Sequence, residues 1–295
     1  MKKLFLLIGL VVIGSALVLL LQSESEQNEP SADVAATIYP IYDITRSIAG
    51  DALNVGLVLP AGASPHTFEP TPSLVRKLSD ASVVYAIGHG FDDWVDSVIE
   101  TVESEKFIVD GGVKLREAEE HEEEGGHHGE EDPHYWLSVT HAIVIASNIK
   151  TDLSSRYPEY EETFTINLAD YSSKLVETDL EIRRVLGEIE NRGLITLHDA
   201  WYYFAEEYDL DIVGTFEPTA GREPTPQYLA DLIGAIEASQ ATTLYTEPQL
   251  GTDSLTSFLA DYNLSLAELD PIGGQSNETY IEMMLQNAQT IANNQ

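Results

Sequence analysis

The stretch YEETFTINLADYSSKLVETDLEIRRVLGEIEN, residues 160–191, decides the fold. Its apolar residues recur at positions 160, 164, 168, 171, 175, 182, 186 and 189, which places them on one face of a single helix. A helix from Glu159 to Asn191 would be about 50 Å long, more than one small lobe requires, and Gly193 can end it. We therefore expect a spine helix, residues 157–192, that joins two lobes.

Short β-rich segments alternate with helical ones on both sides of the spine, which favours βαβ units and parallel sheets. The predicted fold class is α/β, with two lobes that each contain a mostly parallel sheet flanked by helices. We place the N-terminal lobe at residues 33–156 and the C-terminal lobe at residues 193–295. The expected strands are VAATIY (34–39), LNVGLVL (53–59), SVVYAIG (82–88) and KFIVD (106–110) in the first lobe, and GLITLHD (193–199), DIVGTF (211–216), ATTLYT (241–246) and SLAELD (265–270) in the second.

The N-terminus indicates export. Residues 4–21 form an uncharged apolar run directly after Lys2 and Lys3, as in a secretory signal or a membrane anchor. No small-x-small cleavage site follows this run at once, so we favour an uncleaved anchor, with a polar tether completing residues 1–32. The chain has no cysteine, which excludes lipid attachment through cysteine and structural disulfides. We expect the folded part to lie in the periplasm or at the cell surface.

Acidity is the second feature of the composition. The net charge of −35 repels nucleic acid and attracts cations, although adaptation to high salt would give the same surface. The insert EAEEHEEEGGHHGEE, residues 117–131, cannot bury apolar area and is expected to be a solvated loop. Its histidines, His121, His127 and His128, would bind Zn²⁺ weakly and raise its local concentration; the alternative is a simple spacer.

Other histidines occur in structured settings. His66 lies in the proline-rich loop GASPHTFEPTP, His134 in DPHYWL, and His198 at the end of the apolar strand LITLHD. A histidine at a strand end is often a hydrogen-bonded core residue, so spacing alone does not establish a ligand. With Asp270, which ends the strand SLAELD, the four would suit Zn²⁺, and less selectively Mn²⁺ or Fe²⁺.

From Ala35 onward the chain resembles the metal-binding solute receptors of zinc and manganese ABC transporters. The resemblance implies that the metal ligands are His66, His134, His198 and a carboxylate at Asp270. The manganese branch usually has Glu in place of His198, so the third histidine and the His-rich insert resemble the zinc branch. The motifs that carry the resemblance occur in the same order along the chain: GASPHTFEPTPSLVRKL, IGHGFDDW, DPHYWLSVTHAIVIASNI, LITLHDAWYYFAEEYDL, GREPTPQYL, YTEPQL and LDPIGG.

The resemblance implies a monomeric receptor that captures Zn²⁺ and delivers it to a membrane permease, without enzymatic activity. His89, in the turn IGHG, is an alternative ligand, and His141 reads as a surface or capping residue. Glu223 and Glu247 are candidates to orient the imidazoles through their second ring nitrogen.

Three other functions fit the same residues. A manganese or iron receptor would have the same fold, and an adhesin or zinc buffer would bind metal without a permease. A zinc hydrolase needs only a coordination position left for water. The absence of an HExxH motif argues against the hydrolase.

Overall fold

The computed structural model describes residues 31–118, 131–217, 224–252, 255–275 and 279–295. The predicted anchor, the three histidines of the insert and Glu223 lie outside these residues. Residues 32–295 form one compact unit. Within the described ranges, no helix combines the length and the apolar character that a membrane span requires.

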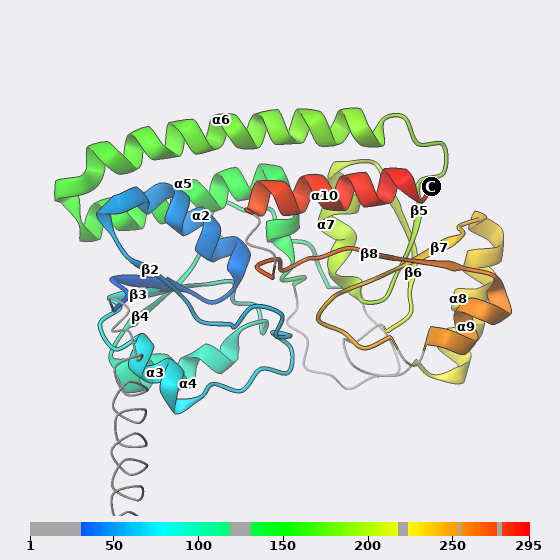
Figure 1. Ribbon diagram of the computed structural model, residues 1–295, viewed down its shortest axis with the longest axis horizontal. Helices are drawn as coiled ribbons and strands as arrows, with labels where there is room; N and C mark the ends of the chain where they lie inside the picture. Colours follow the sequence, from blue (N-terminus) through cyan, green and yellow to red (C-terminus); the bar gives the residue numbers. More distant parts are fainter. Residues whose placement is uncertain (1–30, 119–130, 218–223, 253–254, 276–278) are drawn as a thin grey trace, which may run out of the picture. The chain divides into compact units, whose positions relative to one another are not determined.

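The first lobe is built on a four-stranded parallel sheet (Figure 1). β1 (Val34–Ala36) pairs with β2 (Val55–Leu57) and β3 (Val83–Ala86), and β4 (Glu105–Ile108) forms the edge beyond β3. β1 and β3 are buried along their whole length, as expected for uninterrupted apolar segments in a parallel sheet.

The second lobe repeats this strand order. β5 (Gly193–Thr196) lies between β6 (Asp211–Thr215) and β7 (Thr243–Thr246), and β8 (Ser265–Glu268) forms the edge beyond β7. The prediction of two parallel-sheet lobes is therefore confirmed. The polar residues that follow these strands lie at the carboxyl ends of the sheet, where open α/β sheets bind their ligands.

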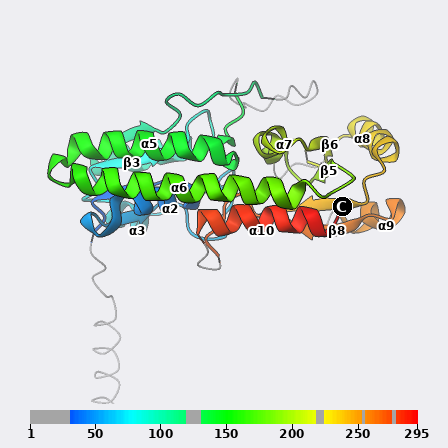
Figure 2. The ribbon, with the colours of Figure 1, turned by 90° about the horizontal axis from the view of Figure 1, so that it is seen from above.

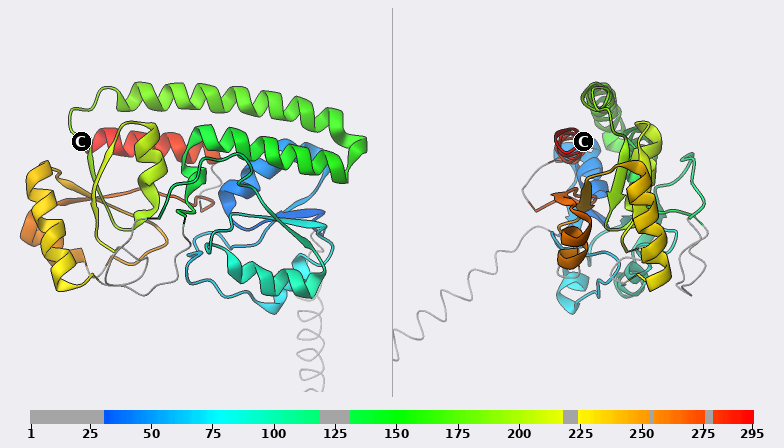
Figure 3. Two further views of the ribbon diagram at one scale, coloured as in Figure 1. Left: turned by 180° about the vertical axis from the view of Figure 1, so that it is seen from behind. Right: turned by 90° about the vertical axis from the view of Figure 1, so that its right-hand side faces the viewer.

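Helices cover both faces of the first sheet and surround the second. In Figure 3, α2 and α5 lie on one side of the first sheet and α3 and α4 on the other. Seen from above, α5, α6 and α10 run side by side (Figure 2), and α6 packs against α2, α5 and α10. The helices are α2 (Tyr39–Ala49), α3 (Pro72–Lys77), α4 (Asp96–Val102), α5 (Val139–Arg156), α6 (Glu161–Leu186), α7 (Tyr202–Glu207), α8 (Pro226–Ser239), α9 (Leu255–Tyr262) and α10 (Tyr280–Asn293).

The long helix is shorter than the sequence pattern predicts. α6 ends at Leu186 instead of Asn191, so its length is about 39 Å at 1.5 Å per residue. The carbonyl of Leu186 accepts a hydrogen bond from Nη2 of Arg192, at 3.3 Å. The residue that follows the helix is Gly187, a poor helix former.

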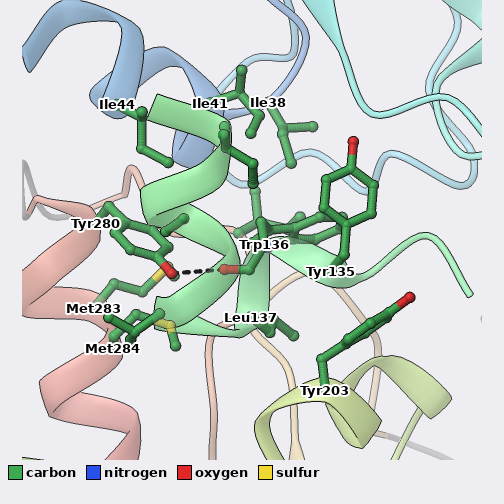
Figure 4. Packing of buried hydrophobic residues seen from close by; sticks show 14 of the residues in the cluster. Ile38, Ile41, Ile44, Tyr135, Trp136, Leu137, Tyr203, Tyr280, Met283 and Met284 are labelled. Atoms are coloured by element: carbon green, nitrogen blue, oxygen red, sulfur yellow. Dashed lines mark hydrogen bonds between the residues drawn. The ribbon is translucent and has the colours of Figure 1, made fainter. Parts of the chain in front are cut away.

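One hydrophobic core runs through both lobes. It contains residues of the first sheet, of α2, α5 and α6, and of α7 and α10 from the second lobe. Trp136 lies among these side chains in Figure 4. Its indole Nε1 donates to the carbonyl of Pro271 at 2.7 Å, and its own carbonyl accepts from the hydroxyl of Tyr280 at 2.7 Å. A residue of the first lobe thus fixes two segments of the second.

We expect Trp136→Ala to lower the free energy of unfolding by about 3–5 kcal/mol, because it removes a fully buried ring and the hydrogen bond to Pro271. Tyr280→Phe is the matched control, since it removes only the hydroxyl and should cost about 1 kcal/mol. Urea denaturation of the metal-free protein measures both values. Equal losses in the two variants would show that the indole ring does not hold the lobes together.

Candidate metal site

Three of the predicted ligands are placed by different parts of the fold. His66 lies in the loop from β2 to α3, and His134 directly precedes the short 3₁₀ helix Tyr135–Leu137. His198 follows the last residue of β5 by two positions. His134 and His198 thus stand next to a regular element, whereas His66 lies within a long loop, six residues before α3.

The structure brings these three rings together. One ring nitrogen from each of His66, His134 and His198 lies within 4.8 Å of the other two. The ring centroids are 4.9 Å apart for His66 and His198, 5.0 Å for His134 and His198, and 5.9 Å for His66 and His134. His134 and His198 are buried, whereas His66 is exposed. The cluster thus has one side open to solvent.

Asp132 orients the ring of His134. Its Oδ1 lies 2.9 Å from Nδ1 of His134 and also accepts the backbone N–H of His134, at 3.0 Å. Its Oδ2 accepts a hydrogen bond from Nη1 of Arg116 at 3.3 Å. With Nδ1 engaged, Nε2 of His134 is buried and has no hydrogen-bond partner among the described residues. A buried imidazole nitrogen in this state is suited to a metal ion.

Glu247 plays the same part for His198. Nδ1 of His198 lies 3.0 Å from Oε1 and 3.2 Å from Oε2 of this buried carboxylate, which also accepts from the indole N–H of Trp201 at 3.3 Å. Nε2 of His198 is 3.3 Å from Oδ1 of Asp199. The ring is held between two carboxylates, one buried and one near the surface.

These carboxylates change the proton affinity of His198. Burial lowers the pKa of its imidazole, but the charge and the hydrogen bond of Glu247 outweigh burial and raise the pKa to about 9. Asp199 and Asp132 add smaller contributions in the same direction. In the metal-free protein at neutral pH, His198 is therefore an imidazolium.

Apolar side chains line most of the space around the rings. Phe91 packs edge-on against both His66 and His134, and Trp136 packs against His134. Leu250, Pro271 and Ile272 add further apolar surface from the second lobe. A wall of this kind limits water and strengthens electrostatic interactions inside the pocket.

Asp270 is not part of this cluster. Its carboxylate lies outside the group whose ring nitrogens come within 4.8 Å of one another. Oδ1 accepts three hydrogen bonds, from Nε2 of Gln249 at 2.8 Å, the N–H of Ile272 at 3.0 Å and the N–H of Gly273 at 2.8 Å. Asp270 lines a neighbouring pocket instead. The carboxylate that the sequence suggested as a fourth ligand is thus engaged with protein donors.

The other two histidines in the described part of the chain stand apart from the three rings. Nε2 of His89 is 3.0 Å from Asp110, and its Nδ1 is 2.8 Å from Glu131, so both nitrogens face carboxylates. His141 is partly buried, packs against Tyr203 and donates its backbone N–H to a serine at the start of α5. Neither residue belongs to the cluster of three.

Sequence reasoning missed two acidic neighbours of the site, Asp132 and Asp199. Each had a visible signal, because each lies within two positions of a candidate ligand in the sequence. A carboxylate this close can reach the ring of its neighbour through a single turn of backbone. Sequence proximity could therefore have identified these two, but not Gln249, which contacts the pocket from a separate loop.

Comparisons with known proteins find similarity over almost the whole chain. Residues 34–294 match the family model described as ZnuA, zinc-uptake complex component A, periplasmic. The zinc-binding lipoprotein AdcA of Streptococcus pneumoniae is 29% identical over 307 residues, which cover 99% of this chain and 60% of AdcA. This chain therefore spans well under two thirds of that relative's length.

Two further comparisons cover nearly the whole of the other protein. The metal ABC transporter substrate-binding lipoprotein ScbA of Streptococcus cristatus is 28% identical over 309 residues, covering 99% of this chain and 98% of ScbA. A crystal structure of ZnuA superimposes with a TM-score of 0.78 at 27% identity and covers 90% of this chain and 99% of that one. The fold of this chain is thus shared with that ZnuA structure over 90% of this chain.

The charge on His198 can be measured directly. We expect its ring signals in an NMR titration of the metal-free protein to move with a midpoint near pH 9, because Glu247 stabilises the imidazolium. In Glu247→Gln this stabilisation is lost while burial remains, so the midpoint should fall below the usual value of about 6.5. Asp199→Asn is the control and should lower the midpoint less. A midpoint that Glu247→Gln leaves unchanged would contradict this assignment.

Proposed function

The chain belongs to the zinc-uptake complex component A family, and we propose that it is an extracytoplasmic solute-binding protein that captures Zn²⁺ and delivers it to the permease of an ABC transporter. The observation that carries this proposal is the convergence of three imidazole nitrogens within 4.8 Å. The names of AdcA, a zinc-binding lipoprotein, and ScbA, a substrate-binding lipoprotein of a metal ABC transporter, support the same role.

The donor set suits zinc. Zn²⁺ prefers nitrogen and sulfur donors in a tetrahedral arrangement, and this chain has no cysteine. His66, His134 and His198 supply three neutral nitrogens once the proton on His198 has left. Mn²⁺ and Fe²⁺ bind an all-imidazole set less tightly than Zn²⁺ does, so we propose zinc as the transported ion.

We propose binding and transport, not hydrolysis. Many zinc hydrolases use a nearby carboxylate that is free to take a proton from the metal-bound water. The two buried carboxylates beside the rings, Asp132 and Glu247, are engaged at Nδ1 of His134 and His198. Relatives named for metal binding and transport are consistent with this proposal.

Capture would begin at the exposed side of the cluster. His66 faces solvent, while the other two rings are buried, so an incoming ion meets His66 first. The net charge of −35 raises the local concentration of cations, and we propose that His121, His127 and His128 of the insert add to this effect. The apolar run at residues 4–21 would hold a monomeric receptor at the membrane, near its permease.

Calorimetric titration with Zn²⁺ and Mn²⁺ tests the proposal. We expect one tight Zn²⁺ site, weaker Mn²⁺ binding at the same site, and loss of at least about a hundredfold in Zn²⁺ affinity in His198→Ala, because a buried ligand is removed. His141→Ala is the matched control, since His141 lies outside the cluster.

Deleting residues 118–130 distinguishes metal binding by the three rings from metal binding by the insert. The deletion should leave the tight site intact and remove only weak sites, because we propose that the tight site is made by His66, His134 and His198, all outside the insert. Loss of the tight site in the deletion, with His198→Ala behaving like the wild type, would place the metal in the insert and overturn the proposal.

Zinc affinity should also depend on pH in a defined direction. The pKa of His198 is about 9, so below that pH its Nε2 carries a proton that the metal must displace. Affinity should therefore rise roughly tenfold per pH unit from pH 7 toward 9, with about one proton released per ion at pH 7.5. Calorimetry in buffers with different ionisation enthalpies counts the protons. Affinity that stays constant over this range would contradict the raised pKa.

A further inference from the structure

Gln249 lines the pocket around the three rings, and its amide oxygen has no role in the contacts described above. Oε1 of Gln249 is buried, and no residue among those described gives it a hydrogen bond. Leaving a buried acceptor unpaired costs about 1–3 kcal/mol. The Glu247 carboxylate in the same pocket has its partners in His198 and Trp201, so this amide oxygen differs from it in having none among the described residues.

The orientation of the Gln249 amide is set by Asp270. Nε2 of Gln249 donates to Oδ1 of Asp270 at 2.8 Å. A carboxylate accepts hydrogen bonds and cannot donate them, so the amide nitrogen must face Asp270 and the amide oxygen must face away. The assignment of the two amide atoms therefore follows from the chemistry of the partner.

Asp270 is itself held rigidly. Besides the two backbone N–H groups that its Oδ1 accepts, its own N–H donates to Oδ1 of Asn287 at 2.9 Å, and its carbonyl accepts from Nδ2 of Asn287 at 2.7 Å. Asn287 is buried on α10. An unbroken series of hydrogen bonds thus runs from α10 through Asp270 to Gln249 at the pocket.

We propose that Gln249 is a positioning residue of the metal site, whose Oε1 accepts a hydrogen bond from a water molecule in the fourth coordination position of Zn²⁺. This inference rests on the proposed function. It adds that a water molecule is the fourth ligand of the ion and that Gln249 holds this water in place. Three imidazoles leave one position of a tetrahedral zinc ion for water, and the metal makes that water a strong hydrogen-bond donor. Asp270 then contributes through Gln249, without touching the ion.

The chemistry of an amide explains why such a water would be held and not activated. A carboxylate in this place could take the proton and leave a hydroxide, which is the nucleophile of zinc hydrolases. An amide oxygen accepts the hydrogen bond but has no useful basicity. Gln249 would therefore stabilise the bound ion and favour its water, the stronger hydrogen-bond donor, over hydroxide, which suits a receptor.

The test uses the full-length protein with one equivalent of Co²⁺, whose absorption bands report the coordination shell. In the wild type, azide should displace the water and change the spectrum. In Gln249→Leu, azide should bind about tenfold more tightly, because the water has lost one hydrogen bond and the anion no longer meets a carbonyl oxygen. Zn²⁺ affinity should fall about ten- to a hundredfold, as for other groups that support a metal ligand.

Three variants serve as comparisons. Asp270→Asn keeps an acceptor for Gln249 and should stay within about threefold of the wild type in Zn²⁺ affinity. Gln286→Leu changes a glutamine of the neighbouring pocket and should alter neither azide binding nor Zn²⁺ affinity. Ser64→Ala removes a buried hydroxyl that lines the same pocket and, like Oε1 of Gln249, has no partner among the described residues. This variant should not alter azide binding. Urea denaturation of each variant confirms that it is folded.

Several outcomes would overturn the inference while leaving the proposed function intact. One is a Gln249→Leu variant that binds both azide and Zn²⁺ like the wild type. Another is a loss in Asp270→Asn as large as that in His198→Ala, with a spectrum insensitive to azide, which would make Asp270 a direct ligand. A third is a response to azide that changes in Ser64→Ala and not in Gln249→Leu. A wild type that binds neither Co²⁺ nor Zn²⁺ at one tight site would instead defeat the proposed function.

Discussion

The pairing of two buried carboxylates with two imidazoles is the interaction on which the site depends. Asp132 and Glu247 are buried, and a carboxylate in such surroundings is stable only when it is hydrogen-bonded or paired with a positive group. Each one meets this need by contacting Nδ1 of a histidine, His134 or His198. The same contact fixes the ring, so Nε2 of both histidines is oriented by protein groups before any ion binds.

Each pair lies within one lobe, so the rings of the two pairs meet only when the two lobes pack against each other. Glu247 and His198 come from neighbouring strands of the second sheet, whereas Asp132 and His134 belong to the first lobe. Trp136, two residues beyond His134, donates its indole N–H to Pro271 of the second lobe and is buried in the core that both lobes share. The geometry of the cluster is therefore set by the same packing that stabilises the whole unit.

The sequence predicts much of this arrangement, because strand ends and rigid loops leave local patterns. The alternation of strands and helices and the positions of the three histidines could be read directly. The C-terminal helix α10 was missed, although the capping box of Thr279 and Glu282 marks its start. The contact between Gln249 and Asp270 links residues 21 positions apart in different loops, and no local pattern encodes it. The end of α6 at Leu186 was also not predicted, because the apolar spacing continues to Ile189.

The unequal burial of the three rings has a consequence for kinetics. An ion held by the three rings as proposed would be able to lose the exposed one, His66, while the two buried imidazoles still hold it. Departure is then a sequence of single bond exchanges that starts at the surface, and the residence time of the ion depends on the mobility of one loop. A surface that binds this loop could shorten the residence time without separating the lobes or unfolding their common core.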